Sequence, residues 1–295
     1  MEKILEIKGL TKHYGRIRAV HMLDMEVGRG QVYGILGPNG SGKTTTLSVI
    51  MGVIRQQSGT FSWFGNGYST GWKKRVGSLI EVPNFYPYLS LVKNLEIIAL
   101  IKEVPAGDID RVLEVTGLIN RKHSPYRTLS LGMKQRLAMA AVLLGDPEVM
   151  VLDEPTNGLD PEGIAEVREI ISDEAEKGKT VILASHILGE VEKVCSHVAV
   201  LKEGELLASG RVDELLGSDP VYMVSATDIQ RFEEIIVRAG KAKKIEKKGD
   251  DLIITCSSPL PPEEINRFAF ENGIVLSKLV PVKKSLESHF LELVK

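Results

Sequence analysis

One glycine-rich run has the residue types and the spacing of a loop that binds phosphate groups. It follows the pattern G-x-x-x-x-G-K-[ST] and consists of Gly37, Pro38, Asn39, Gly40, Ser41, Gly42, Lys43, Thr44 and Thr45. Residues 31–36 before it are short and apolar enough for a buried strand, and residues 45–51 after it begin a helical pattern. A strand, a loop and a helix N-terminus in this order aim backbone N–H groups at one point, where nucleotide phosphates bind.

Two side chains of this loop carry the expected chemistry. Lys43 would reach the β- and γ-phosphates of the nucleotide, and the Thr44 hydroxyl would be a ligand of Mg²⁺. The alternative is a glycine turn with a solvated lysine, because a pattern this short also arises by chance. The strand expected before the loop and the helix expected after it favour the phosphate site.

A pair of carboxylates follows another apolar strand. Residues 149–152 are predicted to form that strand, and Asp153 and Glu154 come directly after it. In a phosphate-loop fold the first carboxylate holds the Mg²⁺ shell, and the second polarises or deprotonates the attacking water. The alternative for this pair is a helix cap, since Asp favours that position.

The composition is that of an ordinary globular protein. Of the 295 residues, 43% are hydrophobic and 26% are charged, and this length allows one large domain or two of ordinary size. The net charge of −2 gives no support to a nucleic-acid binder, so we expect no nucleic-acid partner. Cys195 and Cys256 lack metal-ligand spacing and are predicted to be buried thiols in a reducing compartment.

The sequence predicts no membrane-spanning helix. Every uninterrupted apolar stretch is shorter than the roughly 18 residues that a span needs. Residues 1–8 alternate polar and apolar side chains, which is typical of a strand and not of a signal peptide. If the protein acts at a membrane, another chain must supply the membrane-spanning part.

The spacing of apolar residues predicts a mainly parallel sheet with helices. We expect strands at residues 4–7, 19–27, 31–36, 58–65, 149–152, 180–184, 198–201 and 204–207. We expect helices within residues 45–51, 90–121, 131–144, 163–177 and 188–195. From residue 148 strands and helices alternate, which implies a mainly parallel sheet with its ligand at the carboxyl ends of the strands.

A change in composition at residues 217–220 predicts a linker and a second domain beyond it. The expected elements are strands at 221–225, 245–248, 252–256 and 274–279, and helices at 229–239, from 262 and from 285. This order resembles a small α+β sandwich. The predicted domains are therefore residues 1–216 and residues 221–295.

The segment Leu129, Ser130, Leu131, Gly132 and Met133 makes the chain recognisable. It stands where the ATP-binding cassette (ABC) ATPases have their signature Leu-Ser-Gly-Gly-Gln, and the chain resembles that family over residues 1–216. The family presents Ser-x-Gly at a helix N-terminus to the γ-phosphate held by a second subunit, which implies this role for Ser130 and Gly132. Ser130 is also a good helix N-cap, and the two roles are compatible.

The resemblance implies the fold class. It is α/β, a phosphate-loop NTPase cassette with a mixed sheet core, an antiparallel β subdomain and a helical subdomain. A small C-terminal α+β domain follows the cassette.

Other family motifs occur in family order. Tyr14 lies where the family stacks an aromatic ring on adenine, and an ordinary turn tyrosine is the alternative. Residues 157–160 match the dimer-contact loop, and His186 matches the switch histidine that contacts the γ-phosphate. The resemblance therefore implies Lys43, Glu154 and His186 as the catalytic residues.

Two sites depart from the commonest family pattern. Leu131 and Met133 replace Gly and Gln in the signature, which leaves Ser130 and Gly132 as the expected contacts. Glu81 replaces a glutamine that in most of the family senses Mg²⁺, water and the membrane partner.

The segment around Glu81 resembles that of a narrower group within the family. A glutamate followed by Pro and Tyr-Pro-Tyr-Leu-Ser, together with an accessory C-terminal domain, is similar to the bacitracin-resistance and lantibiotic-immunity ATPases. We therefore expect Glu81 at the metal site beside Thr44 and Asp153.

The resemblance implies the ATP-hydrolysing subunit of an ABC transporter, with ATP and Mg²⁺ as cofactors. Two cassettes, as a homodimer or a pair, would close around two ATP and drive separate integral membrane permease subunits. Export of a peptide antibiotic or drug is the preferred direction. The chain is then expected in the cytoplasm, peripheral at the inner face of the cell membrane through its permease subunits.

Three alternatives to a transporter subunit are disfavoured by the sequence. A soluble ABC ATPase acting on ribosomes or DNA would have two cassettes or a long coiled coil, and the stretch from Lys43 to Ser130 is too short for the latter. A regulatory module with little turnover is disfavoured by intact Lys43, Glu154 and His186. A GTPase is disfavoured because the sequence has no Asn-Lys-x-Asp motif.

Overall fold

The computed structural model describes residues 2–65, 70–81, 84–216, 219–257, 260–282 and 286–287. The chain divides into two compact units, Met1–Val212 and Asp213–Leu293. Residues 217–218 of the predicted linker lie outside the described residues. The predicted final helix also lies outside them, apart from residues 286–287.

A six-stranded sheet forms the centre of the first unit, in the order β5-β6-β7-β3-β8-β9. The strands are β3 Val32–Leu36, β5 Val76–Leu79, β6 Val149–Asp153, β7 Thr180–Ser185, β8 His197–Lys202 and β9 Glu205–Arg211. All neighbours are parallel except β8 and β9. This confirms the predicted mainly parallel sheet, although the short strand β5 was not predicted. Every residue of β3, β6 and β7 is buried, which explains their unbroken apolar runs.

A three-stranded antiparallel sheet lies beside the six-stranded one, in the order β2-β1-β4. Its strands are β1 Lys3–Tyr14, β2 Ile17–Gly28 and β4 Ser58–Trp63. Helix α1, Lys43–Ile50, packs against β2, β6 and β7. Side chains from both sheets and α1 form one buried cluster, in which Trp63 donates its indole N–H to the Ile50 carbonyl at 2.8 Å.

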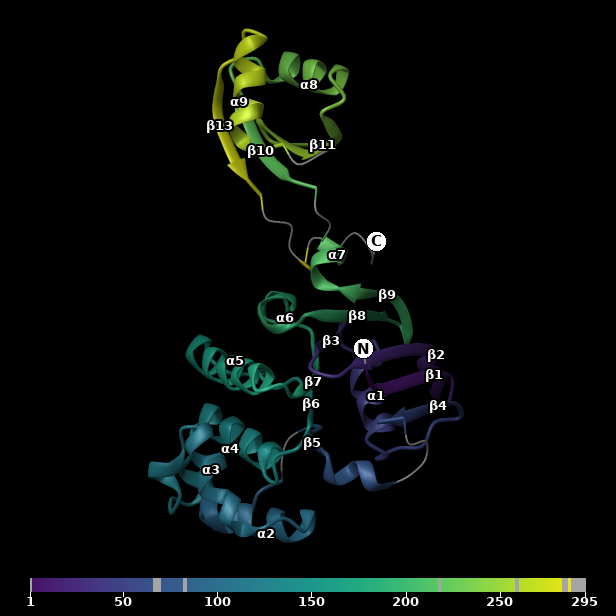
Figure 1. The fold of residues 1–295 in the computed structure, drawn as a ribbon, viewed down its shortest axis with the longest axis vertical. Helices are drawn as coiled ribbons and strands as arrows, with labels where there is room; N and C mark the ends of the chain where they lie inside the picture. Colours follow the sequence, from purple (N-terminus) through teal and green to yellow (C-terminus); the bar gives the residue numbers. More distant parts are fainter. Residues whose placement is uncertain are drawn as a thin grey trace. The chain divides into compact units, whose positions relative to one another are not determined.

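Two helices cover the other face of the six-stranded sheet, α5 Pro161–Glu176 and α6 Leu188–Val194. Figure 1 shows them on one side of β6, β7 and β3, with β1, β2 and β4 on the opposite side. The backbone of β3 and helix α6 approach closely: a Cβ at Gly34 would lie 2.7 Å from a methyl carbon of Val191. The sheet is therefore buried on both faces.

A helical region is inserted between β5 and β6. It contains α2 Leu91–Lys102, α3 Ile109–Val115 and α4 Leu131–Leu143, with short 3-10 helices at Ala106–Asp108, Ile119–Arg121 and Tyr126–Thr128. The predicted helical stretch at 90–121 is broken after α2, where Glu103 has a left-handed φ of 55° and Pro105 follows. The Ser90 side chain caps α2 by accepting a hydrogen bond from the Lys93 N–H.

The second unit is a four-stranded antiparallel sheet with two helices, after the short helix α7 Val212–Leu216. Its elements are β10 Val221–Ala226, α8 Ile229–Arg238, β11 Ala242–Lys248, β12 Asp251–Cys256, α9 Pro262–Glu271 and β13 Leu276–Pro281. The strand order β11-β12-β10-β13 and the sequence β-α-β-β-α-β are those of the ferredoxin-like arrangement. This is the predicted small α+β unit.

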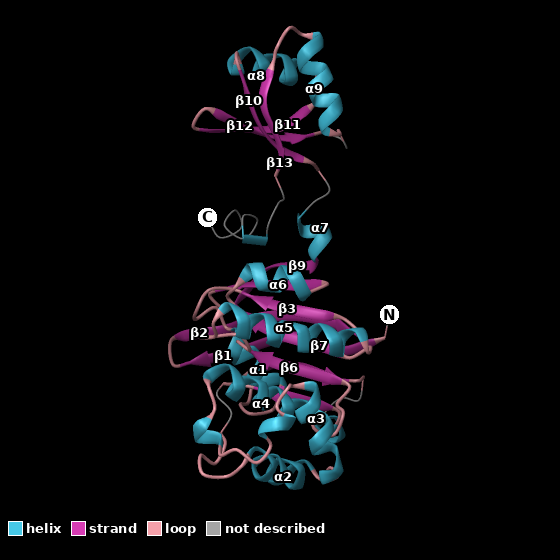
Figure 2. Ribbon diagram, turned by 90° about the vertical axis from the view of Figure 1, so that its left-hand side faces the viewer, coloured by secondary structure: helices cyan, strands magenta, loops and turns pink. Residues whose placement is uncertain are grey.

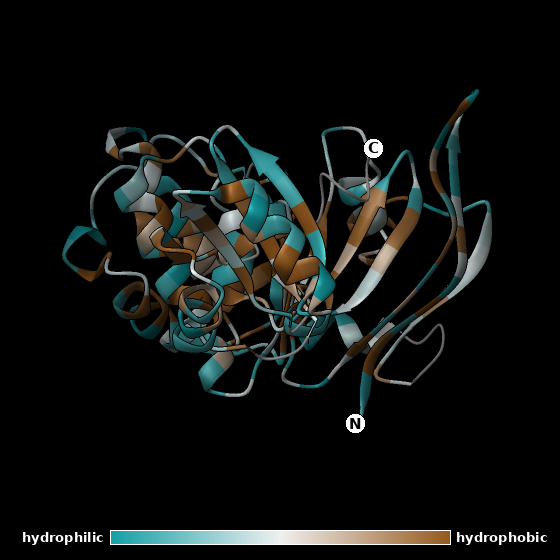
Figure 3. Cartoon of the chain, turned by 90° about the horizontal axis from the view of Figure 1, so that it is seen from above, coloured by the Kyte–Doolittle hydropathy of each residue, from teal (hydrophilic) through white to brown (hydrophobic). Residues whose placement is uncertain are grey.

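Both helices of this unit lie on the same side of its sheet, as Figure 2 shows. Phe232 of α8 and Ile265 of α9 are fully buried against Val224, Ile254 and Cys256 of the strands. Figure 3 colours the chain by hydropathy, with brown apolar residues along many strands and both brown and teal residues on the helices. Cys195 and Cys256 are both free and buried, as predicted.

A substitution in the core of the second unit should destabilise that unit without affecting nucleotide binding. Phe232→Ala removes a fully buried ring and should cost about 3–5 kcal/mol. Native-state hydrogen exchange would show lower protection of the β12 amides and unchanged protection of the β6 amides. Phe270→Ala is the matched control, since Phe270 is 75% exposed. Equal β12 protection in the two variants would contradict this description of the core.

Candidate nucleotide-binding site

The phosphate loop connects the buried strand β3 to helix α1, as predicted. The loop packs tightly against its neighbours: a Cβ at Gly37 would lie 2.3 Å from the Leu201 carbonyl oxygen. A Cβ at Gly42 would lie 2.3 Å from the Ala19 carbonyl oxygen, and Gly42 has a left-handed φ of 103°. Only glycine fits at these two positions, so the loop curls around the N-terminus of α1.

The Lys43 side chain is folded under this loop. It is 5% exposed, and its ammonium group donates hydrogen bonds to the carbonyls of Gly37 at 2.8 Å and Pro38 at 3.2 Å. The same ammonium lies 3.5 Å from Oε1 of Glu154. Pro38, Asn39 and Gly40 are exposed at the tip of the loop. The Lys43 ammonium therefore lies directly beneath the exposed tip of the loop, which is where a lysine would have to lie to bind phosphates.

Asp153 is the last residue of β6, and the Thr44 hydroxyl lies near enough to affect the pKa of its carboxyl. Burial raises the pKa of the Asp153 carboxyl above its ordinary value. The Thr44 hydroxyl opposes this rise in pKa, and the Glu154 and Glu81 carboxylates add to it. Oδ1 of Asp153 and Oγ of Ser41 are buried oxygens without a hydrogen-bond partner among the described residues. Buried acceptors of this kind suit a bound cation and its water ligands.

The donor set at this point fits Mg²⁺ bound together with a nucleotide. Mg²⁺ binds through one or two carboxylates and completes its octahedron with water and substrate phosphates. Asp153 and Thr44 supply a carboxylate and a hydroxyl, and Glu81 lies near enough to affect the pKa of Asp153. In the described part of the chain no three His, Cys, Asp or Glu residues form a self-contained metal site.

Glu154 is held on three sides. Its backbone has a left-handed φ of 46°, and its N–H donates to the Ala184 carbonyl at 2.9 Å. Oε2 of Glu154 lies 2.8 Å from Nδ1 of His186, and Oε1 faces Lys43. His186 follows β7, so the neighbouring strands β6 and β7 bring the two side chains together. These contacts therefore fix the orientation of the carboxylate.

A cavity of about 480 Å³ lies against these carboxylates. Its lining residues are Glu81, Tyr126, Leu131, Lys134, Gln135, Asp153, Glu154 and Asn157. Sequence reasoning gave no role to Lys134 and Gln135. They lie three and four residues after Leu131 on α4, so all three share one helix face, and this spacing is the signal that could have found them.

Ser130 and Gly132 line a different cavity, of about 440 Å³. They share it with Gly158, Leu159 and Asp160 of the predicted dimer-contact loop. Ser130 is exposed, and its side chain caps α4 by accepting from the Met133 N–H at 3.3 Å. Within the described residues, no hydrogen bond or ion pair joins this surface to the phosphate loop of the same chain.

Tyr14 and Glu81 are both accessible. Tyr14 is the last residue of β1, is 50% exposed, and has the Lys12 ammonium 5.3 Å from its ring centroid. Glu81 follows β5, is exposed and has a left-handed φ of 59°. Residues 82–83, part of the segment that carries the predicted subgroup resemblance, lie outside the described residues.

Comparison with known proteins identifies the family. Residues 20–157 match the family described as ABC transporter. The bacitracin transport ATP-binding protein BcrA of Bacillus licheniformis is 37% identical, over 100% of this chain and 98% of that protein. The chain belongs to the ABC transporter ATP-binding proteins. Its fold class, an ABC cassette with an additional C-terminal region, is confirmed.

Other relatives agree with this assignment. The lantibiotic transport ATP-binding protein SrtF of Streptococcus pyogenes is 37% identical over 71% of this chain and 92% of that protein. The structure of cbiO1 from Clostridium perfringens, part of an ABC transporter complex, is 27% identical and covers 81% of this chain and 96% of that one, with a TM-score of 0.66.

As an ABC ATPase, this protein binds ATP and hydrolyses it to drive transport. Cassettes of this fold form dimers and work as subunits of transporter complexes. None of the described helices is long and apolar enough to cross a membrane.

The close packing of the loop predicts a contrast between two glycines. Gly40 and Gly42 both have left-handed φ angles, of 80° and 103°, but a Cβ at Gly40 would meet nothing within 4 Å. Gly42→Ala adds a backbone clash to the shared strain and should bind ATP at least about tenfold more weakly than Gly40→Ala. Isothermal titration of the two folded variants measures this difference. Equal affinities would show that the approach to Ala19 does not shape the site.

Proposed function

We propose that this ABC ATPase powers the export of peptide antibiotics. A relative that it matches over its full length, including the C-terminal unit, is named for bacitracin transport, and another relative is named for lantibiotic transport. On this proposal the protein is peripheral at the inner face of the cell membrane, where separate permease subunits bind it.

The active site is completed by a second chain. The observation that carries this proposal is the position of Ser130 and Gly132, which line a cavity apart from the phosphate loop. Their helix N-terminus is a place where an anion binds well, since its N–H groups and dipole favour negative charge. In a head-to-tail dimer this N-terminus covers the γ-phosphate held on the partner's loop. Tyr14 stacks on the adenine of its own chain's ATP.

On this proposal each site residue of one chain has a separate role in binding or hydrolysing ATP. Lys43 and the N–H groups of the loop bind the phosphates, and Thr44, Asp153 and Glu81 hold Mg²⁺. Bound Mg²⁺ neutralises charge on the β- and γ-phosphates. Glu154 orients the attacking water and accepts its proton, and His186 keeps the carboxylate in place at 2.8 Å.

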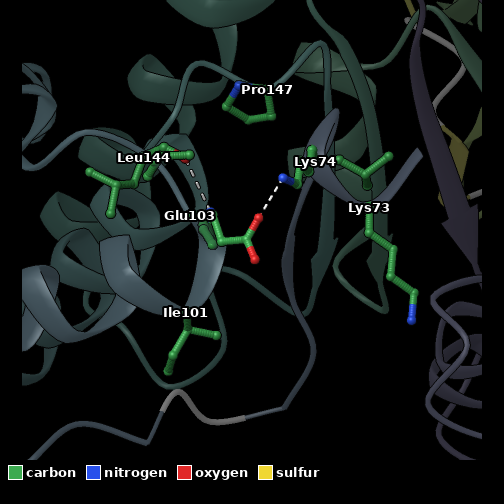
Figure 4. Close-up of a pocket in the computed structure, with 9 residues that line it drawn as sticks. Lys73, Lys74, Ile101, Glu103, Leu144 and Pro147 are labelled. Atoms are coloured by element: carbon green, nitrogen blue, oxygen red, sulfur yellow. Dashed lines mark hydrogen bonds and ion pairs between the residues drawn. The ribbon is translucent and has the colours of Figure 1, made fainter. Parts of the chain in front are cut away.

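The permease subunits contact a surface near the end of α2. Leu100 and Ile101 are 79% and 77% exposed, although both are apolar. Ile101 also lines a cavity of about 310 Å³, where Lys74 and Glu103 point toward one another and form an ion pair (Figure 4). Exposed apolar side chains beside a hollow are typical of a binding surface for another protein.

Glu154→Gln tests the role of the proposed base. The substitution preserves size but removes the proton acceptor, so ATP hydrolysis should fall by about 10²–10⁴-fold while ATP still binds. Because ATP then persists at the interface, the variant should form an ATP-dependent dimer in size-exclusion chromatography. Wild type should show that dimer only transiently. Wild-type turnover in the variant would remove Glu154 from this role.

Glu81 tests the link between hydrolysis and export. A carboxylate at this position is charged and only accepts hydrogen bonds, whereas the usual glutamine is neutral and also donates them. Glu81→Gln should leave ATP binding nearly intact, change the isolated ATPase rate modestly, and lower bacitracin protection of cells that also express the permease. Glu81→Ala should lower protection further. Full protection by Glu81→Ala at matched ATPase rates would show an ordinary solvated glutamate.

A further inference from the structure

Two cationic side chains, Lys102 and Arg111, bind the carbonyl groups at the C-terminal end of helix α4. The Lys102 ammonium donates hydrogen bonds to three carbonyls, those of Ala141 at 2.7 Å, Val142 at 3.2 Å and Leu144 at 3.2 Å. The Arg111 guanidinium donates to the fourth, Leu143, at 3.1 Å. All four carbonyls of residues 141–144 therefore accept a hydrogen bond from a charged donor.

This arrangement satisfies a general requirement of helix ends. The last four carbonyls of an α-helix lack partners within the helix and carry the negative end of its dipole, so cations are favoured there. Lys102 is only partly exposed, and a cation removed from water needs several strong acceptors. The cluster thus fixes the position of the end of α4 and also compensates the burial of Lys102.

Lys102 connects two helices that have different roles. It is the last residue of α2, and it binds the end of α4 opposite to the signature residues Ser130 and Gly132. The Asp108 carboxylate extends the connection, since it accepts from Arg111 at 2.5 Å and from the Gly145 N–H at 2.8 Å. A helix of 13 residues is rigid and about 20 Å long, so its orientation at one end sets the position of the other.

We propose that Lys102 is a positioning residue for ATP-dependent pairing of two chains: it orients α4 so that Ser130 and Gly132 meet the partner's nucleotide. The proposal rests on the two-chain site proposed above. Without Lys102 three carbonyls lose a charged donor, α4 samples more orientations, and the fraction of chains competent to pair falls. Binding of ATP to the chain's own phosphate loop, which lies between β3 and α1, does not depend on this contact.

Three variants test the proposal in the Glu154→Gln background, where the ATP dimer persists. Lys102→Met keeps a similar length without donors, Lys102→Arg keeps the positive charge, and Lys93→Met is the control on the exposed face of α2. ATP affinity of the monomer is measured by titration, the dimer dissociation constant by sedimentation, and the fold by thermal unfolding.

Lys102→Met should weaken the dimer at least about tenfold, since each dimer contains two affected signature helices, and change ATP affinity less than about twofold. Lys102→Arg should recover most of the pairing, and Lys93→Met should match the background. A wild-type dimer constant in Lys102→Met overturns the proposal. Parallel loss of ATP binding and pairing also overturns it, because that is the result of a merely structural role. Failure of the Glu154→Gln background itself to dimerise with ATP would instead refute the two-chain site.

The pH dependence gives a second readout, which decides the question if Lys102→Met does not fold. Burial lowers the pKa of Lys102 to about 8, partly opposed by Asp108. The other charged groups around it are Lys73, Lys74, Glu103 and Arg111. Above pH 8 the unfolded chain binds more protons than the folded one, so this group makes the fold more stable as pH rises.

The affinity of the dimer should fall as pH rises, although the stability of the fold rises. A neutral amine donates two hydrogens and not three, so the wild-type Lys102 dimer should weaken as pH rises through about 8. The Lys102→Arg dimer should not weaken, because its guanidinium stays charged. Equal weakening in both chains overturns the proposal.

Discussion

The ammonium group of Lys43 is a buried cation, and much of the first unit is arranged to hold it. A charge at 5% exposure is stable only with strong partners, and the Gly37 carbonyl and the Glu154 carboxylate provide them. The Gly37 carbonyl reaches the lysine only because the loop is tight, and the loop is tight because glycines pack against Ala19 and Leu201. The Glu154 carboxylate is in reach because Glu154 directly follows β6. In the proposed site the same partners hold the lysine beside the γ-phosphate, so one arrangement would serve both stability and catalysis.

Much of the fold could be predicted because its local signals agree with its packing. Strands such as β3, β6 and β7 are buried on both faces, so they appear as unbroken apolar runs next to clear turn residues. The weaker points were short elements whose form depends on neighbours. Strand β5 contains only Val76–Leu79 and is defined by its pairing with β6. The break after α2 is indicated in the sequence by Pro105, but the left-handed backbone of Glu103 has no such local signal.

The candidate site was predictable where a motif encodes chemistry within a few residues. Lys43, Thr44, Asp153 and Glu154 lie together as expected, and His186 contacts Glu154 across two neighbouring strands. Contacts between distant segments were not predictable in the same way. Three features depend on tertiary structure. They are the left-handed backbone of Glu154, the position of Lys134 and Gln135 in the carboxylate cavity, and the hydrogen bonds of Lys102 to the end of α4. The sequence indicates which groups are candidates for the chemistry, and the packing determines how they are oriented.

The central claim is that each ATP is bound between the loop of one chain and the signature of another. Its most direct test mixes two inactive chains, Ser130→Arg with an intact loop and Lys43→Ala with an intact signature. The account predicts that neither chain hydrolyses ATP alone and that the mixture regains activity, because each heterodimer contains one complete site. Activity of Ser130→Arg alone at the wild-type rate, or a mixture as inactive as its components while Ser130→Arg still binds ATP, would contradict it.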